Sequence, residues 1–112
     1  MMRFEFGDIL LVPFPFTSQA ASKKRPAVVV SKRAYNDAKP DVVVMAVTSQ
    51  LRANTRLGEA WVTEWKAAGL LKPSAVKPVF ATLEQSLVIR RLGVMHPTDS
   101  AALKKAIAQA LG

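Results

Sequence analysis

The fold class follows from one stretch, Asp41-Val42-Val43-Val44-Met45-Ala46-Val47. Its near-continuous β-branched content is typical of a strand that is buried on both faces. Two further apolar runs precede it, at residues 27–30 and at residues 9–12, and the earlier of them follows the turn-like pair Gly7-Asp8. We therefore expect a sheet of short strands.

Prolines and small polar residues interrupt this pattern. Pro13 and Pro15 lie in the segment Pro-Phe-Pro-Phe, and we expect them to prevent a regular ladder because proline supplies no backbone N–H. Residues 17–24 are small and polar, which predicts an exposed, mobile loop. Residues 50–58 are also polar and predict a second loop.

The second half of the chain predicts further strands. Trp61, Thr63 and Trp65 alternate with the residues between them, which favours a fourth strand. Three more segments follow: a turn at 67–69, an extended segment at 74–83, and a short helical turn leading to a last strand at 87–95.

The C-terminal segment has the pattern of a helix. Pro97 fits the first helical position, with His96 before it as the N-cap, and Asp99 places negative charge in the first turn. An apolar stripe at helical spacing consists of Leu103, Ala106, Ile107, Ala110 and Leu111. Five or six strands and one terminal helix predict a mainly β (β-rich α+β) fold, a small barrel or strongly bent sheet. In this position His96 is expected to be a capping or surface residue and not part of a catalytic triad.

Composition limits the classes of function. The chain has 112 residues, half of them hydrophobic, and a net charge of +8, which predicts one globular domain spanning residues 1–112 and an anionic partner. Cysteine is absent and histidine occurs once, which excludes disulfides, thiolate metal sites and multi-histidine metal sites. The eight acidic residues are dispersed and the glycines lack the spacing of a phosphate-binding loop. We expect no metal and no cofactor.

No apolar run has the length of a membrane helix, and Glu5 and Asp8 interrupt the N-terminal apolar segment. We therefore expect a cytoplasmic protein without a membrane partner. A chain of this size builds a small core, and dimerisation would cover more of its surface.

A basic segment, Lys23-Lys24-Arg25-Pro26, joins the first expected loop to an apolar strand. Such a run is commonly a solvated face. Arg25, however, lies where a rigid strand begins, and its planar guanidinium suits phosphate better than an ammonium group does.

A second candidate is Thr48-Ser49-Gln50, which follows the buried strand. These residues suit either a turn that ends the strand or, together with Arg25, a phosphate site without a metal. RNA carries its own nucleophile, the 2′-hydroxyl, beside the scissile phosphate, so such a site needs only to align the backbone and stabilise charge. Arginine and a hydroxyl group can do both.

Several segments in the same order resemble the MazF/PemK toxins of bacterial toxin–antitoxin systems. The resemblance rests on residues 7–12, 24–31 and 47–50, and downstream on Gly69-Leu70, Ser74, Thr82-Leu83, Ser86-Leu87 and Arg91-Leu92-Gly93. It runs from Gly7 to the terminal helix. Each motif alone is weak, but their order and spacing are fairly specific.

The resemblance implies an SH3-like β-barrel that forms a two-fold dimer and cleaves single-stranded RNA without a metal, leaving a 5′-hydroxyl and a 2′,3′-cyclic phosphate or 3′-phosphate. It also implies a cognate antitoxin whose acidic disordered tail covers the basic groove. By position, the family's catalytic arginine and threonine fall on Arg25 and Thr48. The residues expected to bind RNA are Lys23, Lys24, Ser49, Gln50 and Lys77.

Arginine is effectively always protonated, so it makes a poor general base. We expect Arg25 to clamp the transition state and to donate a proton to the leaving 5′-oxygen, while Thr48 holds a non-bridging oxygen. The sequence shows no evident proton acceptor for the 2′-hydroxyl.

The sequence departs from the family at Glu84-Gln85-Ser86, where members more often show Asp-Lys-Ser. Phe14, Phe16 and Trp61 are candidate platforms for base stacking, although we expect at least two of the three to pack in the core.

Two other functions remain open. A gyrase-poisoning toxin on the same fold binds a protein and cuts nothing, but such relatives act through an aromatic C-terminal tail, whereas this sequence ends Gln109-Ala110-Leu111-Gly112. A non-catalytic nucleic-acid-binding barrel would bind RNA with a steep salt dependence and give no product.

Overall fold

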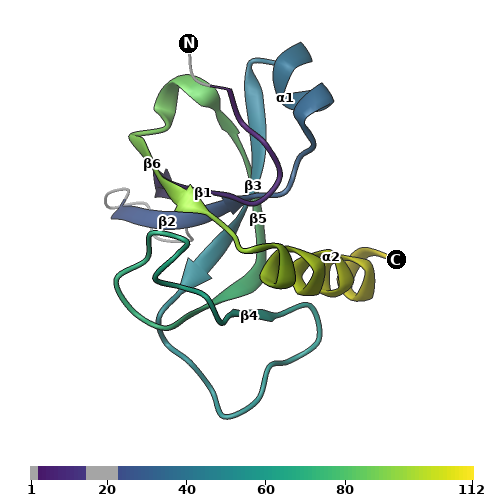
Figure 1. Cartoon of the computed structure of the whole chain (residues 1–112). Helices are drawn as coiled ribbons and strands as arrows, with labels where there is room; N and C mark the ends of the chain where they lie inside the picture. Colours follow the sequence, from purple (N-terminus) through teal and green to yellow (C-terminus); the bar gives the residue numbers. More distant parts are fainter. Residues whose placement is uncertain (1–2, 15–22) are drawn as a thin grey trace.

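The computed structural model describes residues 3–14 and 23–112. Figure 1 shows the elements in chain order: β1 (Asp8–Phe14), β2 (Lys23–Val29), α1 (Arg33–Ala38), β3 (Asp41–Thr48), β4 (Ala60–Val62), β5 (Ser74–Glu84), the 3₁₀ helix η1 (Gln85–Leu87), β6 (Arg90–Val94) and α2 (Pro97–Leu111). Of the loop expected at 17–24, residues 17–22 lie outside the described residues, and Lys23 and Lys24 begin β2. Among the described helices, none is long and apolar enough to span a membrane.

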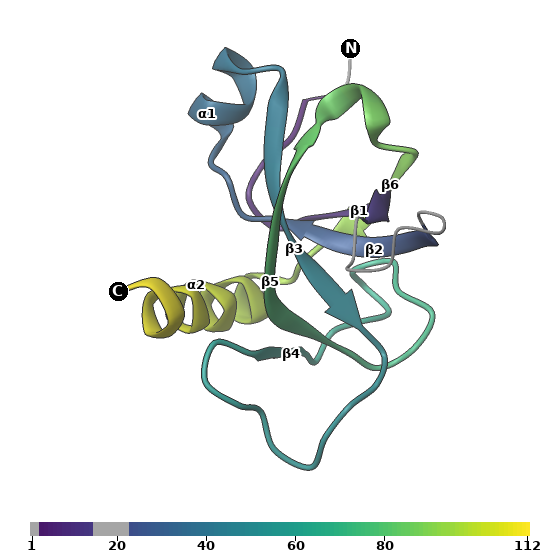
Figure 2. The same ribbon diagram turned by 180° about the vertical axis from the view of Figure 1, so that it is seen from behind.

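All strand pairs are antiparallel, and the strands form one sheet in the order β4-β5-β3-β2-β1-β6. The two opposite views in Figures 1 and 2 show that this sheet is strongly curled, with α2 beside its β4–β5 end. The structure is therefore a half-barrel with a C-terminal helix. The predicted mainly β fold is confirmed.

Strand β1 continues through a proline that was expected to interrupt it. Pro13 lies opposite Lys24 of β2, and the ladder extends to Phe14. On the other side β6 pairs with β1 only from Asp8 to Leu11. The Leu11 carbonyl accepts a bond from Ile89 N–H on that side, so the nitrogen of Pro13, two residues later, faces the same side beyond the pairing with β6. A missing N–H costs little at such an edge.

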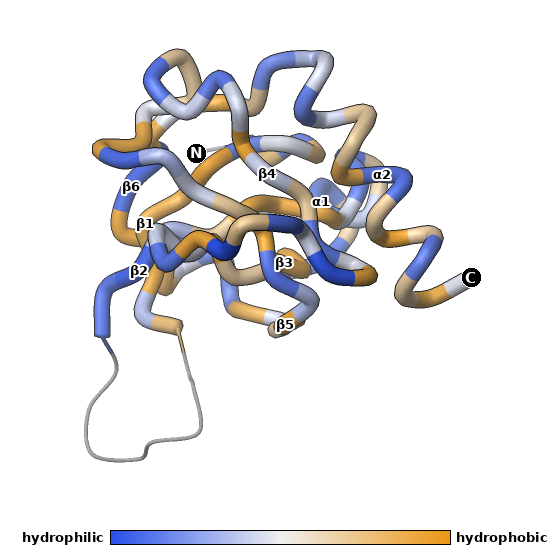
Figure 3. The backbone as a smooth tube through the Cα atoms, turned by 90° about the horizontal axis from the view of Figure 1, so that it is seen from below, coloured by the Kyte–Doolittle hydropathy of each residue, from blue (hydrophilic) through white to orange (hydrophobic). Residues whose placement is uncertain are grey.

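The central strands carry buried apolar side chains on both faces, and Figure 3 shows the hydrophobic colour along β1 and β3. One buried cluster includes Leu10, Val12, Ala27, Val29, Val44 and Ala46. The other, on the opposite face, includes Ile9, Val28, Met45, Val47, Val76 and Leu103 of α2. The tube is hydrophilic where β2 begins. The first three residues of the strand are exposed and its last three are buried, so the strand starts outside the core.

Helix α1 was missed by the sequence analysis. It has six residues and no side-chain cap at its N-terminus, and a helix this short is not stable by itself. Buried Asn36 holds it in place, because its amide donates to the carbonyls of Phe4 at 3.1 Å and Ser31 at 3.0 Å. Tertiary contacts thus stabilise a helix that has no local signal.

Helix α2 begins where its capping residues predicted. The Nδ1 atom of His96 accepts a hydrogen bond from the Thr98 N–H at 3.1 Å, which confirms the capping role, and Pro97 is the first helical residue. Leu103 and Ala106 are buried. The apolar stripe is shorter than expected, because Ala110 and Leu111 in the last turn are exposed.

Strand β4 is shorter than its alternating pattern predicted. It ends at Val62 because the next two residues bond to buried Asp99 at the start of α2. The Asp99 carboxylate accepts bonds from the Thr63 N–H at 3.2 Å, the Thr63 hydroxyl at 2.6 Å and the Glu64 N–H at 2.9 Å. These bonds join the helix to the end of β4, and residues 63–69 form turns.

Two glycines allow the turn after β4 to touch β6. Gly69 has a φ of +84°, and a Cβ there would lie 2.0 Å from the carbonyl oxygen of Leu92. A Cβ at Gly93 would lie 2.3 Å from the carbonyl oxygen of Ala68. The two backbones can approach this closely only because both residues are glycine.

We predict that Gly69→Ala destabilises the protein by more than the ~1–3 kcal/mol expected from backbone strain alone, because its methyl group would also collide with Leu92. Urea unfolding measures the loss. Gly112→Ala is the matched control, since Gly112 also has a positive φ but a Cβ there would meet nothing within 4 Å. Equal stability of the two variants would contradict the prediction.

Candidate active site

Several strand ends meet at one end of the sheet. Because neighbouring strands are antiparallel, the last residues of β1 and β3 lie beside the first residues of β2, β5 and β6. A cavity of about 840 Å³ opens there. Its wall is completed by residues 69–72, at the end of the turns after β4. The fold thus gathers residues from six separate segments around one space.

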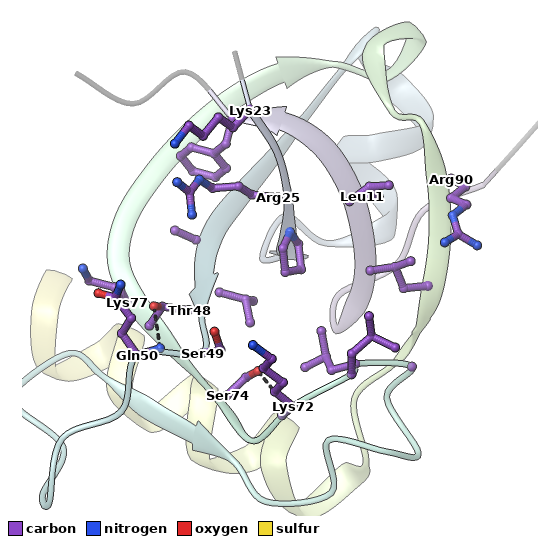
Figure 4. Close-up of a pocket in the computed structure, with 18 residues that line it drawn as sticks. Leu11, Lys23, Arg25, Thr48, Ser49, Gln50, Lys72, Ser74, Lys77 and Arg90 are labelled. Atoms are coloured by element: carbon purple, nitrogen blue, oxygen red, sulfur yellow. Dashed lines mark hydrogen bonds between the residues drawn. The ribbon is translucent and has the colours of Figure 1, made fainter. Parts of the chain in front are cut away.

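The pairing of β2 with β3 brings Arg25 to Thr48. The register places Ala27 opposite Ala46, and two residues further along the two strands are Arg25 and Thr48. Residues two apart on a strand share a face, so both side chains project from the face that carries the Ala27–Ala46 pair. Both line the cavity, and Figure 4 shows them there.

Thr48 is the last residue of β3 and is half-buried, whereas Ser49 and Gln50 are exposed. Its Oγ1 accepts a hydrogen bond from the Gln50 N–H at 3.1 Å, so the expected turn at the strand end is present. This bond orients the hydroxyl group. A hydroxyl has one hydrogen to donate and a second lone pair, and both are suited to a ligand in the cavity.

The cavity is strongly basic. Its charged lining residues are Lys23, Arg25, Lys72, Lys77 and Arg90, and the lining that the structure describes includes no acidic residue. Five of the sixteen basic residues of the chain thus surround one space, where together they attract an anion.

Six of the seven predicted site residues line this cavity: Lys23, Arg25, Thr48, Ser49, Gln50 and Lys77. Lys24 does not line it. It lies between Lys23 and Arg25 on β2, and successive strand residues point to opposite faces.

The sequence analysis missed Lys72, Ser74 and Arg90, which also line the cavity. Ser74 is buried and donates from its hydroxyl to the Lys72 carbonyl at 2.8 Å. The pair Arg90-Arg91 was visible in the sequence, but only the structure distinguishes its members. Arg90 lines the cavity, whereas Arg91 pairs with Asp8 at 3.1 Å.

The three candidate stacking residues have different positions. Phe14 is 2% exposed and belongs to the core, although it also lines the cavity. Trp61 is 41% exposed and lines a second, smaller cavity of about 160 Å³. That cavity shares Thr48, Gln50 and Lys77 with the larger one. Phe16 lies outside the described residues.

The segment that departs from the family pattern has a structural contact. The Gln85 amide donates to the carbonyls of Asn36 at 2.7 Å, Lys39 at 3.1 Å and Asp41 at 2.8 Å. It therefore ties the end of α1 to the start of β3 and does not line the cavity.

Among the described residues, no group of three or more His, Cys, Asp and Glu side chains could hold a metal ion.

Comparison with known proteins gives one family. The model of the PemK-like, MazF-like toxins of type II toxin–antitoxin systems matches residues 5–111. A comparison with curated proteins found no significant match.

Solved structures share the fold at low sequence identity. The Mycobacterium tuberculosis toxin MazF-mt6 is 22% identical, with a TM-score of 0.75 over 92% of this chain and 94% of that chain. An endoribonuclease in complex with its cognate antitoxin, from a mycobacterial species, is 21% identical, with a TM-score of 0.79 over 97% and 95%. MazF from Deinococcus radiodurans is 21% identical, with a TM-score of 0.76 over 100% and 99%.

Proposed function

Because the chain belongs to the PemK-like, MazF-like toxins of type II toxin–antitoxin systems, we propose that it cleaves single-stranded RNA in the cytoplasm without a metal ion. The observation that carries the proposal is the placement of Arg25 and Thr48 on one face of the sheet, in a basic cavity. Endoribonucleases share its fold. The cavity is also large enough to admit more than a single phosphate group.

The proposed reaction uses the nucleophile of the substrate. The 2′-oxygen forms a bond to the adjacent phosphorus as its proton passes to solvent water, and the bond from phosphorus to the 5′-oxygen breaks. The products are a 2′,3′-cyclic phosphate and, once the leaving oxygen is protonated, a 5′-hydroxyl. Since the nucleophile is intramolecular, the protein contributes alignment and stabilisation of charge.

Arg25 is the proposed clamp on the transition state. Charge develops on the phosphate oxygens as the fifth bond forms, and a guanidinium offers five N–H donors in a plane that can contact two oxygens at once. The same group can donate a proton to the departing 5′-oxygen. Its position at the start of β2, opposite Val12 of β1, holds its backbone in a regular ladder.

Thr48 is the proposed donor to a non-bridging oxygen, with its hydroxyl oriented by the Gln50 N–H. Lys23, Ser49, Gln50 and Lys77 surround the pair and are proposed to bind the RNA backbone. Lys72 and Arg90 extend the basic lining. Lys24 can add only to the general attraction, because it lies outside this lining.

We predict that the purified protein cuts single-stranded RNA in EDTA and that Arg25→Ala lowers the rate at least ~100-fold, because the charge on the phosphate loses its clamp. Lys24→Ala is the matched control, since it removes the same charge from the neighbouring residue of β2. Its loss should be much smaller, and circular dichroism checks that both variants fold.

End-mapping of the products by gel electrophoresis gives the readout. Equal cleavage by Arg25→Ala and wild type would show that Arg25 has no catalytic role. RNA binding without product at any enzyme concentration would favour a non-catalytic barrel. Binding to gyrase without RNA cleavage would favour a gyrase-poisoning toxin.

We predict that Thr48→Val lowers the cleavage rate by roughly 10- to 100-fold, because the isosteric side chain cannot hydrogen-bond to a phosphate oxygen. Thr48→Ser keeps the hydroxyl and should retain most of the activity. Single-turnover rates separate this effect from weaker binding. If valine and serine were equally active, the hydroxyl would have no part in the reaction.

The proposed partners are a cognate antitoxin and a second copy of the chain. Structures from Deinococcus radiodurans contain a MazE–MazF pair, and an acidic disordered segment would complement the basic cavity. Homodimer formation would cover apolar side chains that are exposed here, including Leu71, Val94 and Leu111.

We predict that the protein sediments as a dimer at micromolar concentration, since the apolar surface left exposed by a small core favours association. Analytical ultracentrifugation measures the mass of the protein alone, and a monomeric mass would contradict the dimer.

We also predict that an acidic peptide from the antitoxin inhibits RNA cleavage, and that the inhibition weakens as the salt concentration is raised. A peptide without effect on cleavage would contradict the proposal that an acidic segment of the antitoxin binds over the basic cavity.

A further inference from the structure

The smaller cavity lies beside the proposed catalytic pair because three strands carry residues in register. Thr48 of β3 lies opposite Ala75 of β5, and Ala75 lies opposite Trp61 of β4. Paired residues project from the same face of a sheet, and neighbouring strands are ~4.8 Å apart, so the backbones of Thr48 and Trp61 are about 10 Å apart. Ala75 between them is small. An aromatic ring thus lies two strands from the hydroxyl proposed to hold the scissile phosphate.

Trp61 is not needed for the core. Its neighbours Ala60 and Val62 are 5% and 1% exposed, whereas Trp61 is 41% exposed. Strand alternation explains this difference, because β4 turns Ala60 and Val62 inward and Trp61 outward. A large aromatic side chain on the outward face of a short strand offers an accessible ring face.

The backbone that carries Trp61 is held along one edge of β4 and at the end of the strand. β4 pairs with β5 from Ala60 to Val62, and the carboxylate of Asp99 binds the two N–H groups that follow the strand. A stacking platform needs this rigidity, because a ring on a mobile loop would lose entropy when a base binds.

The rest of the smaller cavity suits a nucleotide. Lys77 of β5 also lines this cavity, together with Thr48 and Trp61. Gln50 and Asn54 also line this cavity, and each amide offers both a donor and an acceptor, as the edge of a base requires. Glu59 accepts from the Arg56 N–H at 2.8 Å and pairs with Arg52 at 3.8 Å, which closes the loop around the cavity.

We propose that Trp61 stacks on an unpaired RNA base that flanks the scissile phosphate, and that the smaller cavity is the subsite for this base. The inference rests on the proposed function, since it takes the phosphate to lie at Arg25 and Thr48. Aromatic faces bind unstacked bases of any sequence, and the neighbouring amides add discrimination among base edges. Trp61 is thus a substrate-binding residue, separate from the residues that act on phosphorus.

The first test uses Trp61 as its own reporter. The chain has two tryptophans, so Trp65→Phe leaves Trp61 as the only one. This variant is titrated with a short single-stranded RNA. The RNA carries a 2′-O-methyl group at the nucleotide where cleavage would occur, and this group prevents cleavage because it blocks the 2′-oxygen. Stacking should quench the fluorescence of Trp61, and an oligonucleotide that lacks the base at the flanking position should not.

The second test measures affinity for the same RNA. Trp61→Ala should weaken binding roughly 5- to 100-fold. Trp61→Phe keeps a ring and should retain most of the affinity, which also separates stacking from a folding defect. Leu57→Ala is the matched control, because Leu57 is a 74% exposed apolar residue of the segment that leads into β4 and lines neither cavity. It should bind as wild type does.

The outcomes distinguish the two proposals. If wild-type protein neither binds nor cuts RNA, the proposed function itself is wrong. If wild type cuts RNA, but Trp61→Ala binds as tightly as Leu57→Ala and Trp61 is not quenched, only the stacking subsite is wrong. A loss of affinity that is the same with and without the flanking base would also overturn stacking.

Discussion

The register between β2 and β3 is the constraint on which the site depends. Ala27 lies opposite Ala46, and the same alignment carries Arg25 to Thr48. A shift of one residue would turn Arg25 to the other face of the sheet. The basic cavity would then lose Arg25, although the composition and the strands would be unchanged.

Apolar alternation does not set this register. β2 and β3 bury residues on both faces, as Val28 and Val29 show for β2, so a slipped pairing would also bury apolar side chains. The connection between the strands supplies the missing information. Ser31 Oγ accepts from the Val43 N–H at 3.0 Å, and the Val30 N–H donates to the Val43 carbonyl at 2.9 Å. The bonds of Asn36 hold α1, which lies within this connection, against Phe4 and Ser31 and so help to maintain the alignment.

The division of the chain into core and site has a simple electrostatic consequence. Apolar residues fill the middle of each central strand, so charged residues occupy the strand ends, and antiparallel order brings those ends together. Five cations share one cavity there without a neighbouring carboxylate among the described lining. The positive charges repel one another in the isolated chain, and an anionic partner would neutralise them. Trp61 extends it with an aromatic face, held in place by a strand whose end is anchored on Asp99.

Local patterns in the sequence determined most of the elements and singled out Arg25 and the segment Thr48-Ser49-Gln50 as candidate site residues. The strand of residues 41–48, the helix that begins at Pro97 and the candidates Arg25 and Thr48 all follow from features within a few residues of one another: β-branched content, a cap, a strand end. Only the tertiary structure decided the short helix α1, the tolerance of Pro13, and the presence of Arg90 but not Lys24 in the cavity. The physical reason is that strand pairing joins residues distant in sequence, and which face a side chain occupies depends on partners that no local pattern specifies.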